Sequence, residues 1–346
     1  MLTFPISHWK SGFRPFQITV KTDNTGTSND DQFTLPLNTG ETYDCWIFWG
    51  DSTSTHQTTT TSPTHTYAAG AGIYQISITG TFPAIQFNAG GDCLKVVSFD
   101  NWGDVVWSTF YNAFYGCANM EMLATDGATA QTNSVTQMRF AFRNCTSMAR
   151  MDFIDTSSVT NFYDTWRSTG LTSFPLLNVS SGTNFVDTWR ACGGLAGVDF
   201  PTLSFDSMTN GSFCFAGYGI STSSYSALLV DLAANNSETS VAFNGGTATF
   251  SETAVDSGTT TATTASKLVE AGQNFDVTVS VGDIVHNTTD DTYAKVTAID
   301  SATTLSLDTD IMVSGETFVV QSSDAAKARY SLVNDQSWTI TDGGPV

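Results

Sequence analysis

The chain has 346 residues, of which 40% are apolar, 12% aromatic and only 13% charged, and its formal net charge is −20. The aromatic content argues against a disordered chain, which combines high charge with few aromatics. The acidity argues against binding to nucleic acid or to an anionic bilayer, and no apolar run reaches the roughly 18 residues that cross a membrane. The length favours two or three domains, and the scarcity of charge favours a mostly β protein.

The first 86 residues predict an arm and a domain of strands. Residues 1–11 are expected to form an N-terminal arm, and they lack the basic and apolar segments of a secretory signal. From residue 12 to 86, short runs of alternating polar and apolar residues predict strands separated by Asn- and Gly-rich turns. These runs lie at 16–20, 32–37, 43–49 and 73–78. Several short strands at this spacing are typical of a β-sandwich.

Three signals in this domain belong together. They are the W-G-D turn at 49–51, the H-T-Y triplet at 65–67 and the strand at 72–78. Together they resemble the polycystic-kidney-disease (PKD) type of immunoglobulin-like domain, although Ser52 stands where that family usually carries glycine. The resemblance implies a spacer or adhesion module without enzymatic activity.

From about residue 88 to 222 the sequence repeats. Large aromatic residues recur at intervals of 28, 24, 23 and 26 residues, mostly four residues after an apolar position and three before a small one. This period predicts a solenoid with one strand and one short helix per unit, in which stacked units share a core. The helix is expected at the aromatic pairs four residues apart, and strands at 151–153 and 198–200. The predicted core positions are Phe110, Phe114, Cys117, Met138, Phe142, Cys145, Phe162, Trp166, Phe185, Trp189, Cys192 and Phe215.

The repeat pattern V-T-x-F/M-x-x-x-F/W-x-x-C, with D-T-S-S-V-T at 155–160, closely resembles the BspA-type leucine-rich-repeat surface proteins, whose repeats also occur in Mycoplasma surface lipoproteins. Segments at 227–232, 241–246, 328–332 and 338–344 resemble the helix–strand cap of that family. The resemblance implies a leucine-rich-repeat solenoid over 88–257 that is closed by a C-terminal cap over 322–346.

A segment of different character, 258–321, separates the two halves of this cap. It begins with the low-complexity run at 258–264, which predicts a flexible linker. Five short strands then predict a small inserted β-barrel or sandwich, and they lie at 267–269, 281–285, 293–299, 304–307 and 315–320. The V-G-D-x-V and L-x-L-x-x-D-I patterns of this segment resemble a module of tailed-phage structural proteins.

The residues that usually carry chemistry are scattered. None of the six cysteines lies in a C-x-x-C pair or near a histidine, so buried reduced thiols are expected rather than zinc ligands or disulfides. No nucleophile-elbow, zinc-protease or phosphate-loop motif occurs. The sequence therefore predicts no catalytic residue, no cofactor and no metal site. The acidic pairs at 30–31, 290–291 and 308–310 are interpreted as solvated turns rather than as Ca²⁺ ligands.

One arginine follows the aromatic position directly in each of three repeats: Arg143, Arg167 and Arg190. Asp164 and Asp187 precede the last two by three residues, which is a pairing distance on a helix. One interpretation is an arginine ladder that binds an acidic glycan or protein. The other, which ordinary surface chemistry favours, is a row of ion pairs on a solvated edge.

Modules that bind or display, without a catalytic motif, predict a non-enzymatic surface protein. The phage-like segment favours a virion protein assembled in the host cytoplasm, where unpaired cysteines are ordinary. We expect a homo-oligomeric tail fibre or receptor-binding adhesin whose partners are a host-cell surface glycan or protein and other virion proteins, without nucleic acid or membrane insertion. The alternatives are a capsid decoration or head-fibre protein, a bacterial surface adhesin, and a glycan depolymerase tailspike, because a carboxylate pair has no fixed sequence spacing.

Overall fold

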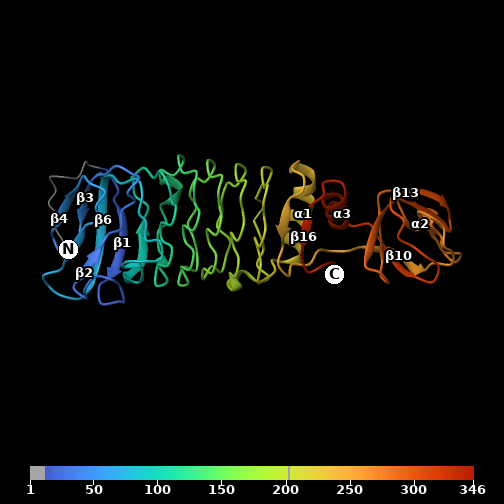
Figure 1. Cartoon of the computed structure of the whole chain (residues 1–346), viewed down its shortest axis with the longest axis horizontal. Helices are drawn as coiled ribbons and strands as arrows, with labels where there is room; N and C mark the ends of the chain where they lie inside the picture. Colours follow the sequence, from blue (N-terminus) through green and yellow to red (C-terminus); the bar gives the residue numbers. More distant parts are fainter. Residues whose placement is uncertain (1–11, 202) are drawn as a thin grey trace.

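The computed structural model describes residues 12–201 and 203–346 and shows an elongated, mostly β protein of several domains (Figure 1). A six-stranded sheet forms one end, the repeat region follows as a stack of coils, and two helices with a second β-domain form the other end. The expected arm at 1–11 lies outside the described residues.

The N-terminal region contains a strand at each place where the alternating pattern predicts one, and two further short strands. The order in the six-stranded sheet is β4 (Ser54–Gln57), β3 (Asp44–Phe48), β6 (Ile73–Thr81), β1 (Phe16–Lys21), β7 (Val96–Asn101) and β8 (Glu121–Met122). A two-stranded sheet pairs β2 (Gln32–Thr34) with β5 (Thr64–Thr66). Every second residue of β1 is buried, as is typical of a strand with one face on a core.

The six-stranded sheet crosses the boundary that the sequence places near residue 87. β1 pairs antiparallel with β6 on one edge and with β7 on the other, and β8 adds in parallel to β7. The ring of Phe16 lies 5.4 Å from that of Phe99 and 5.0 Å from that of Trp107. One continuous core therefore runs from the N-terminal sheet into the repeats. The sheet extends across the boundary because the backbone N–H and C=O groups of β1 need hydrogen-bond partners on both edges of the strand.

The W-G-D turn and the H-T-Y triplet contact each other. Trp49 stacks on His65 with ring centroids 4.8 Å apart, and His65 Nε2 lies 2.8 Å from Asp51 Oδ2. Ser52, at the one departure from the PKD-like pattern, has a φ of +74°. This is the left-handed backbone that glycine adopts most easily, so a serine at this position carries backbone strain.

The repeats form a coil stack, residues 102–221, that is joined by a ladder of backbone hydrogen bonds. Alternate amides of one coil donate to carbonyls of the next, as from Met138 to Asn161 at 3.0 Å and from Phe142 to Thr165 at 2.9 Å. Isolated parallel bridges connect successive coils in a row through Gln137, Asn161, Asn184 and Asn210. Each coil thus depends on its neighbours for both its hydrogen bonds and its core.

The short helix expected in each coil is wrong. The described residues of the coil stack contain tight turns and the 3₁₀ turns η3 (Gly127–Thr129) and η4 (Gly193–Leu195), but no α-helix. Residues with φ between +56° and +101° stand two positions before and two after each stacked aromatic. They are Asn112, Phe140, Asp164, Asp187 and Phe213 before it, and Gly116, Asn144, Ser168, Ala191 and Gly217 after it. An α-helix requires right-handed dihedrals throughout, so these positions end any helix within one turn.

The aromatic pairs four residues apart still lie on one side of the coil, because two successive tight turns bring them back to the same face. The rings of Phe162 and Trp166 have centroids 6.2 Å apart. The strands expected at 151–153 and 198–200 are wrong as well, since neither segment has strand structure. The coils pair through single bridges elsewhere, in the row at Gln137, Asn161, Asn184 and Asn210.

A cap of two helices and two short strands closes the far end of the stack. Its elements are α1 (Thr222–Asn235), β9 (Ala242–Asn244), α3 (Asp324–Asn334) and β16 (Thr339–Thr341). The side chain of Ser221 caps the first turn of α1 and that of Ser323 caps α3. β16 pairs in parallel with β9, whose Phe243 bridges to Gly211 in the last coil. The two halves of the cap therefore meet although about 70 residues separate them.

Those intervening residues form a β-domain with its own core. The strand order is β10 (Ala254–Thr259), β15 (Thr317–Gln321), β12 (Ile284–Asn287), β13 (Thr292–Ser301), β14 (Thr304–Leu307) and β11 (Lys267–Val269), with the short helix α2 (Phe275–Thr278). The five predicted strands are present. The amide of Ser322 donates to the carbonyl of Thr253 at 3.0 Å, so the two ends of the insertion lie side by side and interrupt the cap at little cost.

The flexible linker expected at 258–264 is wrong. Gly258 and Thr259 belong to β10, which pairs with β15. Thr260 is buried, and its amide donates to the carbonyl of Glu316 at 2.9 Å. Thr263 accepts a hydrogen bond from the amide of Ser314 at 2.8 Å. The run of threonines has the low complexity of a linker, but threonine is also a common strand residue. Here its backbone and hydroxyl groups bond to neighbouring protein groups instead of to water.

Candidate functional site

The predicted core positions form a ladder inside the coil stack. All twelve side chains have no solvent-exposed area. The rings of Phe114 and Phe142 stack at 5.8 Å, those of Trp166 and Trp189 at 5.6 Å, and those of Trp189 and Phe215 at 5.5 Å. These residues are enclosed, so they hold coil to coil and offer no surface to a partner.

The cysteines of the repeats continue this ladder. All six cysteines of the chain are free and buried. The Cys145 thiol donates to the carbonyl of Phe114 at 3.1 Å, and the Cys192 thiol to that of Trp166 at 2.9 Å. Burial raises the pKa of the Cys45 thiol to about 12 and raises the pKa of Cys117 and Cys214 well above the ordinary range.

We expect the native protein to resist thiol alkylation. Only the thiolate reacts, and burial both removes access and raises the pKa of these groups. Incubation with iodoacetamide at pH 8, followed by mass spectrometry, should show fewer than one modified thiol per native chain and six after unfolding in guanidinium. Cys93, the most exposed at 8%, should react first. Rapid labelling of all six in the native state would contradict the enclosed ladder.

The exposed part of the coil stack carries the three predicted arginines along one edge. Arg143 Nη1 lies 3.0 Å from Asp164 Oδ2, and Arg167 Nη1 lies 3.6 Å from Asp164 Oδ1. In the next coil, Arg190 Nη1 lies 3.0 Å from Asp187 Oδ1. The ion pairs predicted from spacing thus exist, but they close tight turns and bridge coils rather than following a helix.

Aromatic rings lie between these arginines. Arg143 lies over the ring of Tyr115 at 5.1 Å, and Arg190 lies over that of Phe213 at 5.2 Å. A fourth arginine, Arg139, lies over Phe140 at 4.7 Å and over Tyr163 at 5.0 Å. We call this surface the arginine edge: Arg139, Arg143, Arg167, Arg190, Asp164, Asp187, Tyr115, Phe140, Tyr163 and Phe213. Planar guanidinium groups that stack on rings keep donors free at their rims.

The charge of the arginine edge is opposite to that of the whole chain. Four of the 13 basic residues gather here against two aspartates, in a protein of net charge −20. Burial raises the pKa of Asp164 and Asp187 adds to the rise, while Arg143 and Arg167 oppose it. The Asp164 side chain is 1% exposed, whereas the arginine side chains are 23–38% exposed. The buried carboxylates therefore position the arginines, and the guanidinium groups face outwards.

The sequence does not reveal the contribution of Arg139 and the four rings. Tyr115 and Tyr163 directly follow a core position, whereas Phe140 and Phe213 stand at left-handed positions of their turns. Phe140 and Phe213 share one position of the repeat, but Tyr115 and Tyr163 stand at two others, so no single column of the pattern marks all four rings. The only signal is the high density of Arg, Tyr and Phe between 139 and 167.

Other kinds of site are not assembled in the described parts of the chain. Within residues 12–201 and 203–346, no three His, Cys, Asp or Glu side chains are grouped so as to hold a metal ion. The acidic residues of the β-domain instead make protein contacts, such as Asp308 with the Tyr330 hydroxyl at 2.9 Å and Asp310 with the amide of Ser266 at 2.8 Å. None of the described helices has the length and apolar character that crossing a bilayer requires.

Comparison with known proteins adds no relative. No family model matches the chain, and neither a curated protein nor a solved structure matches it.

Proposed function

We propose that this protein is a non-enzymatic surface component of a tailed-phage particle, a tail fibre or receptor-binding adhesin that recognises a glycan or protein on the host cell. The arginine edge carries this proposal. It concentrates outward-facing cations and aromatic rings on a chain that is otherwise strongly acidic. Arginine and aromatic residues are the types most enriched in binding surfaces.

The domain arrangement supports the same proposal. We propose that the N-terminal sheet is a PKD-like immunoglobulin domain, that the coil stack is a BspA-type leucine-rich-repeat solenoid, and that the inserted β-domain is the phage-type module. A rod of stacked coils with a domain at each end can hold one surface away from its attachment point (Figure 1). Six buried free thiols suit assembly in a reducing cytoplasm.

The test is binding of purified protein to host cells, measured by flow cytometry. The variant combines Arg143→Gln, Arg167→Gln and Arg190→Gln with Asp164→Asn and Asp187→Asn, because a buried carboxylate left without its arginine would destabilise the fold. We expect at least a tenfold loss of binding with an unchanged melting temperature. The control combines Lys21→Gln, Arg150→Gln and Lys267→Gln, which removes three cations elsewhere on the surface. Equal binding by both variants would reject the arginine edge as the recognition surface.

Copy number per particle separates a fibre from a capsid decoration protein. Quantitative mass spectrometry of purified particles should find a few to a few tens of copies for a tail fibre. Hundreds of copies per particle would instead indicate a capsid decoration protein. Recovery in bacterial envelopes and absence from particles would favour a bacterial adhesin instead.

A further inference from the structure

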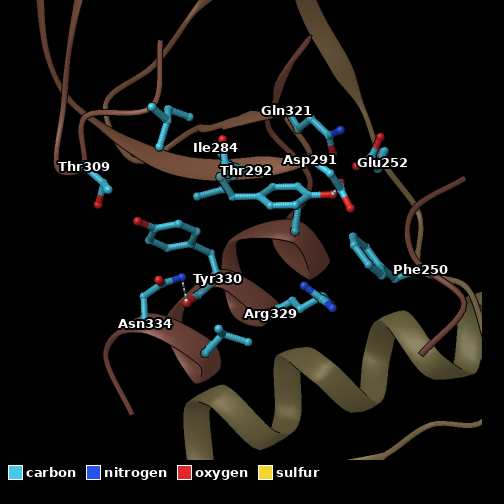
Figure 2. A pocket seen from close by; sticks show the side chains of 14 residues that line it. Phe250, Glu252, Ile284, Asp291, Thr292, Thr309, Gln321, Arg329, Tyr330 and Asn334 are labelled. Carbon is cyan, nitrogen blue, oxygen red and sulfur yellow. Dashed lines mark hydrogen bonds between the residues drawn. The ribbon is translucent and has the colours of Figure 1, made fainter. Parts of the chain in front are cut away.

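A cavity of about 290 Å³ lies where the β-domain meets the cap. Strands β12, β13 and β15 provide one wall, and helix α3 with the segment at 250–252 provides the other. In Figure 2 the polar groups of Gln321, Glu252 and Asp291 gather towards one end, and Tyr330 and Asn334 lie towards the other. This volume is at the lower limit of small-molecule sites, which span about 300–1,000 Å³.

Gln321 is the unusual residue of this cavity. Its side chain is 1% exposed, it lines the cavity from the end of β15, and neither its amide nitrogen nor its amide oxygen has a hydrogen-bond partner among the described residues. Glu252 Oε1, from the other wall of the cavity, is also buried without a partner. Burial raises the pKa of Glu252; the nearby Gln321 side chain, which faces the carboxyl group without forming a hydrogen bond of normal length, and the charge of His286 lower it by less. Unpaired buried polar atoms destabilise a fold, so their retention in a central strand points to a ligand that pairs them.

The remaining charged groups of the cavity already have partners. Arg329 Nε lies 2.8 Å from Asp342 Oδ2, and Asp291 Oδ1 lies 2.9 Å from His286 Nε2. A phosphate or sulfate group in this cavity would lie beside the carboxyl groups of Glu252 and Asp291, with no unpaired cation among the described residues of the lining to neutralise it. A positively charged amine would lie beside the guanidinium group of Arg329. The electrostatics therefore favour a neutral ligand.

The shape of the lining narrows the class of ligand. Phe250, Tyr293 and Tyr330 supply aromatic surfaces, and Gln321 with Glu252 supplies two amide N–H donors and several acceptors beside them. A pyranose ring has the complementary surfaces, because its C–H face is apolar and its rim carries hydroxyls that both donate and accept. A flat apolar ligand would leave the Gln321 amide unpaired.

We propose that this cavity binds a single neutral hexose unit, with its hydroxyls paired to the Gln321 amide and the Glu252 carboxyl group. This deepens the proposed function, on which it rests, by naming a neutral sugar as the recognised chemistry and by placing it apart from the arginine edge. A terminal residue of a cell-surface glycan and a free sugar share this chemistry.

The test uses the full chain and its Gln321→Met variant, with the methyl glycosides of glucose, galactose, mannose and N-acetylglucosamine as probes. Saturation-transfer NMR and calorimetry should detect millimolar binding of at least one glycoside by the native protein. Methionine fills the same space without unpaired polar atoms, so the variant should melt about 2–4 °C higher and bind at least tenfold more weakly. The matched control is Gln75→Met, on the exposed face of β6, which should bind as the native protein does.

Each outcome has a distinct meaning. Binding of no glycoside, together with a lower melting temperature for Gln321→Met, would overturn the proposal and assign Gln321 a structural role. If the glycosides fail but purified host glycan binds and Gln321→Met abolishes that binding, the ligand is a glycan terminus rather than a free sugar. Cell binding that depends on the arginine edge but not on Gln321 would reject this site while leaving the proposed function intact. Glycoside binding without any cell binding would support this site and reject the proposed function.

Discussion

Replacement of Lys95 by methionine is expected to lower the free energy of unfolding by about 3–5 kcal/mol. Lys95 is the last residue of the 3₁₀ turn η2 (Cys93–Lys95), and its side chain has no exposed area. Its ammonium donates to the carbonyl of Ser28 at 3.1 Å, to that of Asn29 at 2.8 Å and to that of Gln32 at 3.0 Å. The Lys95 ammonium group thus links a loop of the N-terminal domain to the start of the repeats through three hydrogen bonds.

Asp92 completes this buried group. Its carboxylate lies 4.0 Å from Lys95 Nζ and accepts hydrogen bonds from the amides of Thr27, Ser28 and Thr34 at 2.7–3.0 Å. Although burial opposes it, these hydrogen bonds and Lys95 lower the pKa of Asp92. A carboxylate whose pKa is lower in the folded state stabilises the fold above its unfolded pKa of about 3.9, and this contribution is lost as the pH falls through the folded value.

Urea unfolding followed by tryptophan fluorescence measures both effects. Lys95→Met should lower the midpoint at pH 7, and Asp92→Asn should flatten the loss of stability below pH 4. The matched control is Lys21→Met, because the pair of Lys21 with Asp23 at 2.6 Å is exposed to solvent and contributes at most about 1 kcal/mol. An effect of Lys95→Met no larger than that of the control would show that the buried cation is dispensable.

Truncation of Trp189 to alanine is expected to cost about 3–5 kcal/mol, the range for removing a large aromatic side chain from a core. Trp189 is fully buried at the centre of the aromatic ladder, between the rings of Trp166 and Phe215. Phe174 also meets it edge-on at 5.9 Å. The cavity left by alanine would therefore open onto three coils at once.

The effect of this truncation should spread along the stack. In a structure where each unit contacts only its neighbours, loss of one interface weakens the coils on both sides first. Hydrogen exchange should show lost protection at residues 162–218, with the N-terminal sheet still protected. The control is Phe213→Ala, because the Phe213 ring is 50% exposed and its loss should cost about 1 kcal/mol or less. Uniform loss of protection across the chain would instead indicate a single cooperative unit.

Much of the fold could be predicted from local patterns. Alternation of polar and apolar residues locates β1, β3 and β6, and the spacing of the aromatics locates the ladder through Trp166 and Trp189. These predictions succeed because burial of a side chain is decided by periodicity over a few residues. The predicted helix in each coil failed for the same reason, since a spacing of four suits both a helix and two successive tight turns. The left-handed Asp164 and Asp187 were the available signal, because aspartate, asparagine and glycine adopt that backbone most readily.

The polar groups could not be predicted in the same way. Lys95 meets Ser28 across 67 residues, and Arg143 meets Asp164 across 21. Gln321 and Glu252 line one cavity from opposite ends of the inserted domain. No periodicity links such positions, because a hydrogen bond or an ion pair depends on the relative placement of elements that are far apart in the chain.

The amino-acid sequence by itself determined the mostly β composition, the repeat with its enclosed aromatic residues, and the interruption of the cap by a second β-domain. These features follow from the burial of apolar side chains, which is a local and periodic property. Only the tertiary structure decided that the N-terminal sheet and the repeats share one core, that arginines of successive coils converge on Asp164, and that Gln321 lies unpaired in a cavity. Those features depend on the register between coils and on the docking of separate units, which the sequence specifies only through the complete fold.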